Sequence, residues 1–304
     1  MKIAILGATG HLAKCALWAW SQDMNNEFYL FSRKKDKLKT LIKDFSGLKY
    51  HLIEGYDMFA SYKYDVIFNG TGFWDMPGCI SAEVFTLTEE FDKIILEYQK
   101  LHPLTKAIHI SSGAVYSGRY DLPVEENSQA VLEVNHIKVG DFYSIAKINS
   151  EAKHRAHSEF SIIDLRLFGF FSRFMDLEYH YLLSAIISCL KSKKVFTCVG
   201  DNFWRDYIHM DDFSNLLLGI CKQEYINEAI DVRSTRPISR DDMIKLFVNE
   251  YGLSVKIEED KDMISKTGTK PYYYSHRETS VYIPRFSSEE ALREELRYFI
   301  QDKE

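Results

Sequence analysis

Short apolar runs alternate with amphipathic stretches along the first half of the chain. The runs have the length and composition of buried strands, and the stretches between them carry apolar residues at helical spacing. The predicted strands are 2–6, 27–31, 49–54, 65–68, 106–110 and 161–165, and the predicted helices are 14–21, 88–102 and 141–160. Strands that alternate with helices indicate an α/β fold, here a Rossmann-type doubly wound parallel sheet.

The second half of the chain has a less regular pattern. The predicted helices are 177–190, 211–221 and 239–251, and the predicted strands are 195–199 and 229–232. Strand 229–232 is expected to rejoin the sheet, whereas the polar, Tyr-rich stretch 261–277 has no clear period and is predicted to be a mobile flap. We therefore expect a dinucleotide-binding domain at 1–166, rejoined by 205–234, and a smaller mixed α/β substrate-binding region at 167–304.

A glycine turn joins the first strand to the first helix. Glycines at this place let the backbone approach a pyrophosphate, and the helix N-terminus favours its negative charge. The alternative is a plain tight turn between strand and helix. The third glycine of the usual dinucleotide fingerprint is replaced by Ala13. The residues predicted to contact the cofactor are Gly7, Thr9, Gly10, His11 and Leu12.

The end of the second strand carries Ser32 and Arg33. An NAD-binding chain usually has a carboxylate here for the ribose hydroxyls, and a hydroxyl followed by cations suits a 2′-phosphate instead. We predict that NADP(H) is favoured and that NAD(H) is possible. The lysines that follow could simply begin a solvated helix, but that alternative does not account for the missing acid.

Two later turns supply further cofactor candidates. Asp57 follows the third strand and could accept from the adenine amino group, although a surface aspartate in a turn is an equal alternative. Asn69, Gly70 and Thr71 follow the fourth strand, where a parallel sheet opens its ligand crevice.

Tyr143 and Lys147 lie four positions apart on a predicted helix, so their polar ends share one face. A cation about 4 Å from a phenolate stabilises it by ~1–4 kcal/mol, which suits a tyrosine that exchanges a proton with a carbonyl or alcohol oxygen. Ser111 and Ser112, at the end of the fifth strand, could reach the same oxygen. Taken alone, the spacing of Tyr143 and Lys147 is equally compatible with a tyrosine packed on the core and a solvated lysine.

Composition narrows the other possibilities. A formal net charge of -6 gives no basic surface for nucleic acid, and the five cysteines and ten histidines show no metal-binding spacing, so no metal is expected. The longest later apolar run, 181–190, is too short to span a bilayer. We therefore expect a cytoplasmic protein with reduced thiols and no membrane partner.

Taken in order, these motifs resemble those of the extended short-chain dehydrogenases/reductases, the NAD-dependent epimerase/dehydratase family that modifies nucleotide-linked sugars. The resemblance implies that Tyr143 is the general acid/base and that Lys147 also holds the nicotinamide ribose. It further implies that Ser112 binds the substrate oxygen. The motifs are Gly7-x-x-Gly10, Ser111-Ser112-x-x-Val115-Tyr116, Tyr143-x-x-x-Lys147, Arg166-Leu167-Phe168, 205–212 and 284–292.

The resemblance also implies roles for residues around the substrate. Phe168 would cover the nicotinamide, Arg205 would meet the nucleotide diphosphate, and Tyr116 and Gly169 would contact the nucleotide sugar. The family usually has Asn where this chain has Gly169, and an expected Arg-Pro-x-Asp segment is replaced by Lys270-Pro271-Tyr272-Tyr273. The family's members often form homodimers through the helix that carries the catalytic tyrosine.

The residues after the active-site serine narrow the chemistry. A sugar 4,6-dehydratase needs an acid/base pair there, and this chain has Gly113 and Ala114, which cannot move a proton. The favoured hypothesis is NADPH-dependent reduction of the keto group of a nucleotide-linked 4-keto-6-deoxysugar, for polysaccharide or glycoconjugate biosynthesis. One alternative is a nucleotide-sugar 4-epimerase with tightly bound NAD. An alternative of another class is a non-catalytic NADP(H)-sensing module.

Overall fold

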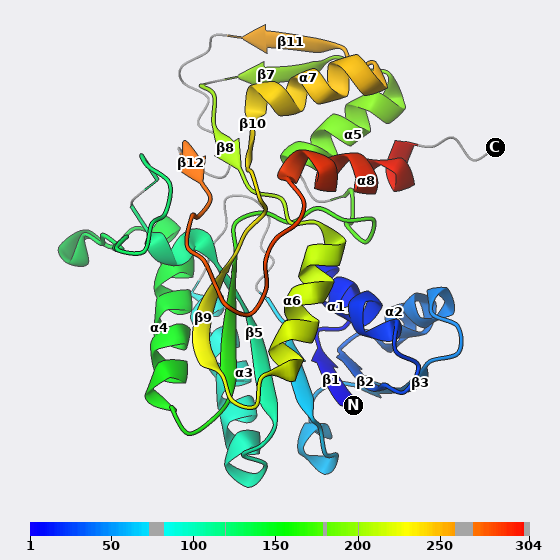
Figure 1. The fold of residues 1–304 in the computed structure, drawn as a ribbon, viewed down its shortest axis with the longest axis vertical. Coiled ribbons are helices and arrows are strands. Elements are labelled where there is room, and N and C mark those ends of the chain that lie inside the picture. Colours follow the sequence, from blue (N-terminus) through cyan, green and yellow to red (C-terminus); the bar gives the residue numbers. More distant parts are fainter. Residues whose placement is uncertain (73–81, 119, 179–180, 200, 259–269, 301–304) are drawn as a thin grey trace.

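A seven-stranded parallel sheet forms the base of the molecule (Figure 1). The computed structural model describes residues 1–72, 82–118, 120–178, 181–199, 201–258 and 270–300. The strand order is β3-β2-β1-β4-β5-β6-β9. The strands are β1 (Lys2–Leu6), β2 (Glu27–Ser32), β3 (Lys49–Glu54), β4 (Val66–Asn69), β5 (Lys106–Ser112), β6 (Ile162–Leu167) and β9 (Asn227–Val232). The order reverses between β1 and β4, and a sheet of this kind binds its ligand at the carboxyl ends of the strands beside that point.

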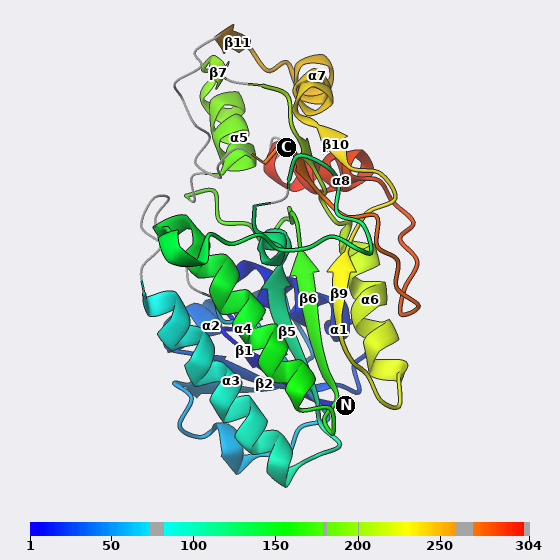
Figure 2. The ribbon, with the colours of Figure 1, turned by 90° about the vertical axis from the view of Figure 1, so that its left-hand side faces the viewer.

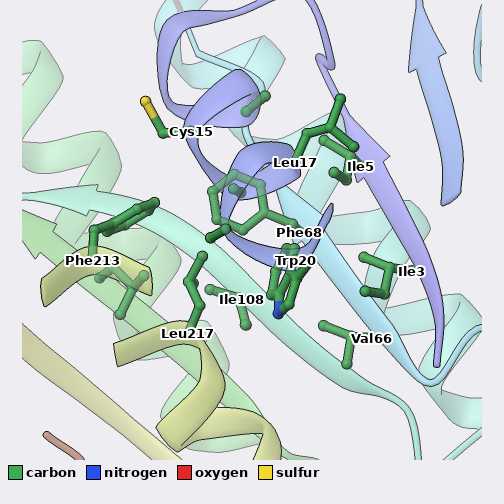
Figure 3. Packing of buried hydrophobic residues seen from close by; sticks show 14 of the residues in the cluster. Ile3, Ile5, Cys15, Leu17, Trp20, Val66, Phe68, Ile108, Phe213 and Leu217 are labelled. Atoms are coloured by element: carbon green, nitrogen blue, oxygen red, sulfur yellow. The ribbon is translucent and has the colours of Figure 1, made fainter. Parts of the chain in front are cut away.

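Helices cover both faces of this sheet, so its inner strands β1, β2 and β4 are largely buried (Figures 1 and 2). Alternate residues of β1 face opposite sides: Ile3 and Ile5 pack with the first group of helices, and Ala4 and Leu6 pack with the second. Figure 3 shows Trp20 packed beside Phe68 in the first layer. The first group is α1 (His11–Ser21), α2 (Lys35–Leu41) and α6 (Met210–Lys222), and the second is α3 (Glu83–Leu101) and α4 (Phe142–Ala156).

A smaller lobe lies beyond the carboxyl ends of the strands (Figure 1). Its helices enclose a separate apolar core around Phe171, Phe247 and Leu292. The helices are α5 (Leu182–Ser192), α7 (Arg240–Tyr251) and α8 (Ser288–Ile300). One small sheet pairs β7 (Phe196–Val199) with β11 (Val255–Glu258), and another has the order β10 (Ile238–Ser239), β8 (Trp204–Arg205), β12 (Tyr272–Tyr273). Short 3-10 helices lie at Ile42–Asp44, Phe59–Ser61, Gly113–Tyr116, Val134–His136 and Val139–Asp141.

The doubly wound α/β fold is confirmed, including the return of β9 to the sheet. Several helix boundaries are wrong. The helices expected over 14–21 and 88–102 begin earlier, at His11 and Glu83. The helix expected over 141–160 ends at Ala156, because turns carry the chain directly into β6. The helix expected over 177–190 begins only at Leu182, where the Tyr181 backbone N–H donates to the Ser184 hydroxyl and fixes its start.

Two predictions for the C-terminal half also need correction. Of the turn expected over 200–204, residue 200 lies outside the described residues, and Trp204 is the first residue of β8. Of the flap expected over 261–277, residues 261–269 lie outside the described residues, whereas 270–277 includes β12. The division into domains at 1–166 and 167–304 stays a prediction. Among the described residues, no helix is both long enough and apolar enough to cross a membrane.

Candidate active site

The turn after β1 has the shape that a pyrophosphate needs. Gly7 has a φ of +66°, and a Cβ there would lie 3.1 Å from the backbone of Gly70, so both conformation and space require glycine. The Gly10 N–H donates to the Gly7 carbonyl at 2.8 Å, and α1 begins at the next residue. The turn therefore leaves a helix N-terminus open beside a bare backbone, which fits the pyrophosphate of a dinucleotide.

Ala13 replaces the usual third glycine, and its methyl group fits because the residue that follows β4 is a glycine. A Cβ on Gly70 would lie 2.9 Å from the Ala13 methyl group. Since Gly70 has no Cβ, α1 packs closely on the carboxyl end of β4 despite the extra methyl. The close packing of helix on strand, which the third glycine of the fingerprint usually allows, is therefore kept.

The hydroxyl of Ser32 is held at the end of β2. It accepts from the Lys34 N–H at 3.1 Å and lies 3.3 Å from the Thr9 hydroxyl. Arg33 is exposed, and its charge acts on Tyr56, which lies close to Gly7. Burial raises the pKa of Tyr56, and Arg33 opposes that shift. Tyr56 thus lies beside both the glycine turn and Arg33, and its position just after a strand end is the signal that could have pointed to it.

The turn after β4 is fixed by side chains. Asn69 accepts from the Thr71 backbone N–H at 3.2 Å and donates to the His109 ring at 3.2 Å. These bonds hold the Asn69-Gly70-Thr71 turn against β5. Asp57 is exposed on the surface.

The side chains that follow the glycine turn face the C-terminal lobe. The His11 ring lies 2.8 Å from the Ser172 hydroxyl, and burial together with Lys14 lowers the pKa of His11 to about 4. The imidazole is therefore neutral near pH 7. Leu12 is partly buried and packs against the core of the sheet. Any contact of these two residues with a cofactor stays a prediction.

The residues that we predict to transfer the proton lie at the carboxyl end of the sheet. Ser112 ends β5, and Tyr143 lies in the first turn of α4. The Lys147 ammonium donates to the Ile110 carbonyl at 2.8 Å and lies 5.8 Å from the centre of the Tyr143 ring. Ser112 Oγ and the Tyr143 phenol both lie beside Tyr273 of β12. Tyr273 of the C-terminal lobe is therefore a neighbour of both hydroxyls.

Ser111 and Tyr116 direct their hydroxyls away from that group. The Ser111 hydroxyl donates to Glu151 at 2.6 Å. The Tyr116 hydroxyl donates to Asp231 at 3.0 Å and accepts from Arg166 at 2.7 Å. These side chains form a buried ionic network beneath the site. The network braces α4 against β6 and β9, and a substrate contact by Tyr116 stays a prediction.

Phe168 covers the start of the 3-10 helix that follows Ser112. A Cβ on Gly113 would overlap the Phe168 ring, so the glycine permits this contact. A Cβ on Gly169 would lie 2.6 Å from the Asp206 carbonyl oxygen. The backbone therefore leaves no room at 169 for the asparagine that the family usually has.

Two cations lie on the lobe side of the site. Arg205 donates to the Lys270 carbonyl at 2.7 Å, and the Lys270 ammonium lies 4.7 Å from the centre of the Tyr273 ring and 4.8 Å from that of Tyr120. Burial and the charge of Arg205 lower the pKa of Lys270 to about 8. No carboxylate of the described residues lies within 4.0 Å of either cation. The pair therefore suits an anionic ligand.

Lys270, Tyr273 and Tyr120 were not predicted as site residues. The signal was present in the run of tyrosines after Lys270, but a two-residue strand has no period that would reveal it.

The profile of the NAD dependent epimerase/dehydratase family matches residues 4–232. This chain belongs to that family. It is an NAD(P)-dependent enzyme of the extended short-chain dehydrogenase/reductase type, and the glycine turn, Ser112, Tyr143 and Lys147 all lie inside the matched region. No curated protein matches the sequence.

Solved structures of other family members share this fold. UDP-glucuronic acid 4-epimerase from Bacillus cereus, in complex with UDP-glucuronic acid and NAD, superimposes with a TM-score of 0.79 at 18% identity, over 98% of this chain and 99% of that chain. dTDP-glucose 4,6-dehydratase from Bacillus anthracis, in complex with NAD, gives 0.78 at 13% identity, over 100% and 97%. ADP-L-glycero-D-manno-heptose-6-epimerase from Helicobacter pylori gives 0.79 at 14%, over 98% and 96%.

Proposed function

We propose that this family member reduces the keto group of a nucleotide-linked 4-keto-6-deoxysugar with NADPH. The observation that carries the choice of reaction is the end of β2, where Ser32 and the exposed Arg33 replace the usual carboxylate. A cation and a hydroxyl suit the 2′-phosphate of NADPH. NADPH is a cofactor consumed in net reductions, so its selection favours a reductase.

The glycine turn and α1 would hold the pyrophosphate, and Lys147 would hold the nicotinamide ribose. Bound there, NADPH supplies the hydride that adds to the keto carbon. The keto oxygen lies between the hydroxyls of Tyr143 and Ser112 in this arrangement. Tyr143 transfers its proton to that oxygen as negative charge develops, and the Lys147 ammonium stabilises the phenolate left behind. Ser112 donates a hydrogen bond to the same oxygen. The net change is one hydride and one proton added to the ketone, which becomes an alcohol.

The residues around the proposed substrate position favour a nucleotide diphosphate as ligand and disfavour dehydration as the reaction. Arg205 and Lys270 offer two cations beyond the sugar position, suited to a diphosphate. Gly113 and Ala114 are buried and offer no acid or base for eliminating water.

A 4-epimerase is the second candidate, because several of the similar structures are named as nucleotide-sugar 4-epimerases, one of them in complex with NAD and UDP-glucuronic acid. Such an enzyme oxidises and then reduces one sugar carbon, so it retains its NAD. The two candidates therefore differ in whether the cofactor is consumed.

The deciding experiment follows the absorbance of reduced nicotinamide while the protein is mixed with NADPH, or NADH, and a panel of nucleotide-linked 4-keto-6-deoxysugars. We expect one ketosugar to be reduced, with NADPH preferred. Tyr143→Phe should lower kcat by about 100- to 10,000-fold, because it removes the proton donor. Tyr50→Phe, at an exposed position on β3, is the matched control and should keep full activity.

Other outcomes select among the alternatives. No oxidation across the panel, together with NAD released when the purified protein is denatured, would establish the epimerase. Full cellular function of Tyr143→Phe would favour the non-catalytic NADP(H)-sensing module.

Three further expectations accompany this proposal. We propose a homodimer formed through α4, a location in the cytoplasm, and a role in polysaccharide or glycoconjugate biosynthesis. The dimer is tested by light scattering of the purified protein, where a mass of one chain, 35.5 kDa, would contradict it.

A further inference from the structure

Tyr273 is the residue of the C-terminal lobe that reaches the proton-transfer group. It belongs to β12, which pairs in parallel with β8 so that Tyr273 lies opposite Arg205. Its ring meets Phe168 edge-on, with ring centres 5.2 Å apart, and Tyr120 in the same way at 5.3 Å. Strand pairing and ring packing together fix where its hydroxyl points.

That hydroxyl lies 3.0 Å from Ser112 Oγ, the atom that the proposed reaction assigns to the keto oxygen. The Ala114 backbone N–H lies 3.2 Å from Ser112 Oγ and also reaches the Tyr273 oxygen. Each hydroxyl has one proton to give and two lone pairs with which to accept. The direction of the bond between them therefore decides what Ser112 can offer a substrate.

The direction of the bond between Ser112 and Tyr273 follows from the need of each hydroxyl proton for an acceptor. Within the described residues, Ser112 Oγ is the one acceptor at hydrogen-bond distance from the Tyr273 hydroxyl. If Ser112 donated to Tyr273, the Tyr273 proton would have no partner among the described residues, which is unfavourable for a partly buried hydroxyl. When Tyr273 donates instead, both lone pairs of Ser112 are engaged, by Tyr273 and by the Ala114 N–H. The Ser112 proton is then left to point into the pocket.

We propose that Tyr273 is a positioning residue: by donating to Ser112, it directs the Ser112 proton toward the substrate oxygen. This inference rests on the proposed function, which is what brings a keto oxygen to Ser112. A ketone oxygen only accepts hydrogen bonds, so a serine fixed as a donor matches it. The match improves as the oxygen gains negative charge during hydride transfer, so Tyr273 acts on kcat more than on KM.

A double-mutant cycle on the full-length enzyme tests this role, with the reductase assay as the readout. Ser112→Ala should lower kcat about 100-fold, as expected for losing one donor to the developing alkoxide. Tyr273→Phe keeps the ring and removes the hydroxyl, and should lower kcat about tenfold with KM within about twofold of wild type. In the Ser112→Ala background, Tyr273→Phe should cause no further loss, because its only effect passes through Ser112.

Tyr272→Phe is the matched control. It lies on the same strand, and its ring stacks on Trp204 with centres 5.0 Å apart, so it should leave kcat unchanged. Thermal unfolding of Tyr273→Phe and Tyr272→Phe should coincide, which separates positioning from loss of structure.

Three results would overturn the positioning role while leaving the reductase in place. They are an equal loss from Tyr273→Phe in both backgrounds, no loss at all, or a gain in activity, since a gain would mean that Tyr273 obstructs the substrate. A wild-type enzyme that reduces none of the ketosugars would remove the proposed function and this role with it.

Discussion

The two sides of the active site are built from different kinds of structure. The sheet side carries Ser112, Tyr143 and Lys147 on a seven-residue strand and a fifteen-residue helix. The lobe side carries Arg205 and Tyr273 on strands of two residues each. Buried ionic networks brace the sheet side, whereas ring packing and cation–π contacts hold the lobe side. We infer that the sheet side sets the chemistry and that the lobe side can change with the substrate.

The largest effect is expected on the sheet side, where a change to a buried charge should lower the free energy of unfolding. His154 of α4 is fully buried, 2.9 Å from Asp164 and 3.4 Å from Asp92. Burial alone would lower the pKa of His154, but the two carboxylates outweigh it and raise the pKa to about 9. His154→Gln leaves both acids without this cation and should lower the free energy of unfolding by about 3–5 kcal/mol.

The wild type provides a second test of the same cluster. Because the pKa of His154 is raised on folding, its stabilisation is complete below about pH 6.5 and is lost as the pH rises through about 9. Urea titrations should show about 3 kcal/mol less stability at the alkaline end of this range. His157→Gln, which alters a partly exposed residue paired with Glu159, should keep that pH dependence. A flat wild-type profile would contradict a charged His154.

The lobe side should respond through substrate affinity. The pKa of Lys270 is lowered to about 8 by burial and by Arg205, so Lys270 loses its charge as the pH rises through 8. The titratable groups that face it are Arg205, Tyr273 and Tyr120. The KM for the nucleotide sugar should increase about tenfold between pH 7 and 9, because an anion then meets one cation instead of two.

Initial rates as a function of pH measure this increase. Lys270→Met should have a KM that is already high at pH 7 and changes little with pH. Lys245→Met, at an exposed position on α7, should follow the wild type. A steep pH dependence retained in Lys270→Met would assign the titration to another group.

The smallest effect is expected at the ribose end of the cofactor site. Arg33→Ala removes an exposed cation and should reduce the preference of kcat/KM for NADPH over NADH by about three- to tenfold. The control is Lys35→Ala, at the exposed first residue of α2. Equal preference in Arg33→Ala and wild type would remove the basis for assigning NADPH.

The sequence was enough to predict the sheet side because its signals are long and local. The inner strands β1, β2 and β4 are apolar runs, and Tyr143 and Lys147 lie one helical turn apart. Ser111 shows the limit of such reasoning. It looks equivalent to Ser112 in the sequence, but neighbouring residues on a strand face opposite ways, and its hydroxyl meets Glu151.

The lobe side could not be predicted because its contacts are distant in the chain. Ser112 and Tyr273 are 161 positions apart, and β12 is too short to produce a periodic pattern. The role of Gly169 was also hidden, since only the fold brings the Asp206 carbonyl against it.

The contact between Ala13 and Gly70 changes how relatives of this protein can be recognised. The Ala13 methyl group fills the gap between α1 and the end of β4, and position 70 then has no room for a Cβ. A search for three glycines in the first turn would reject this chain, although its first helix packs as closely on the sheet as the third glycine would allow. A search rule that accepts alanine at position 13 when a glycine follows the fourth strand would retain it. A sequence motif of this kind is better defined by the residues that contact each other than by consecutive positions alone.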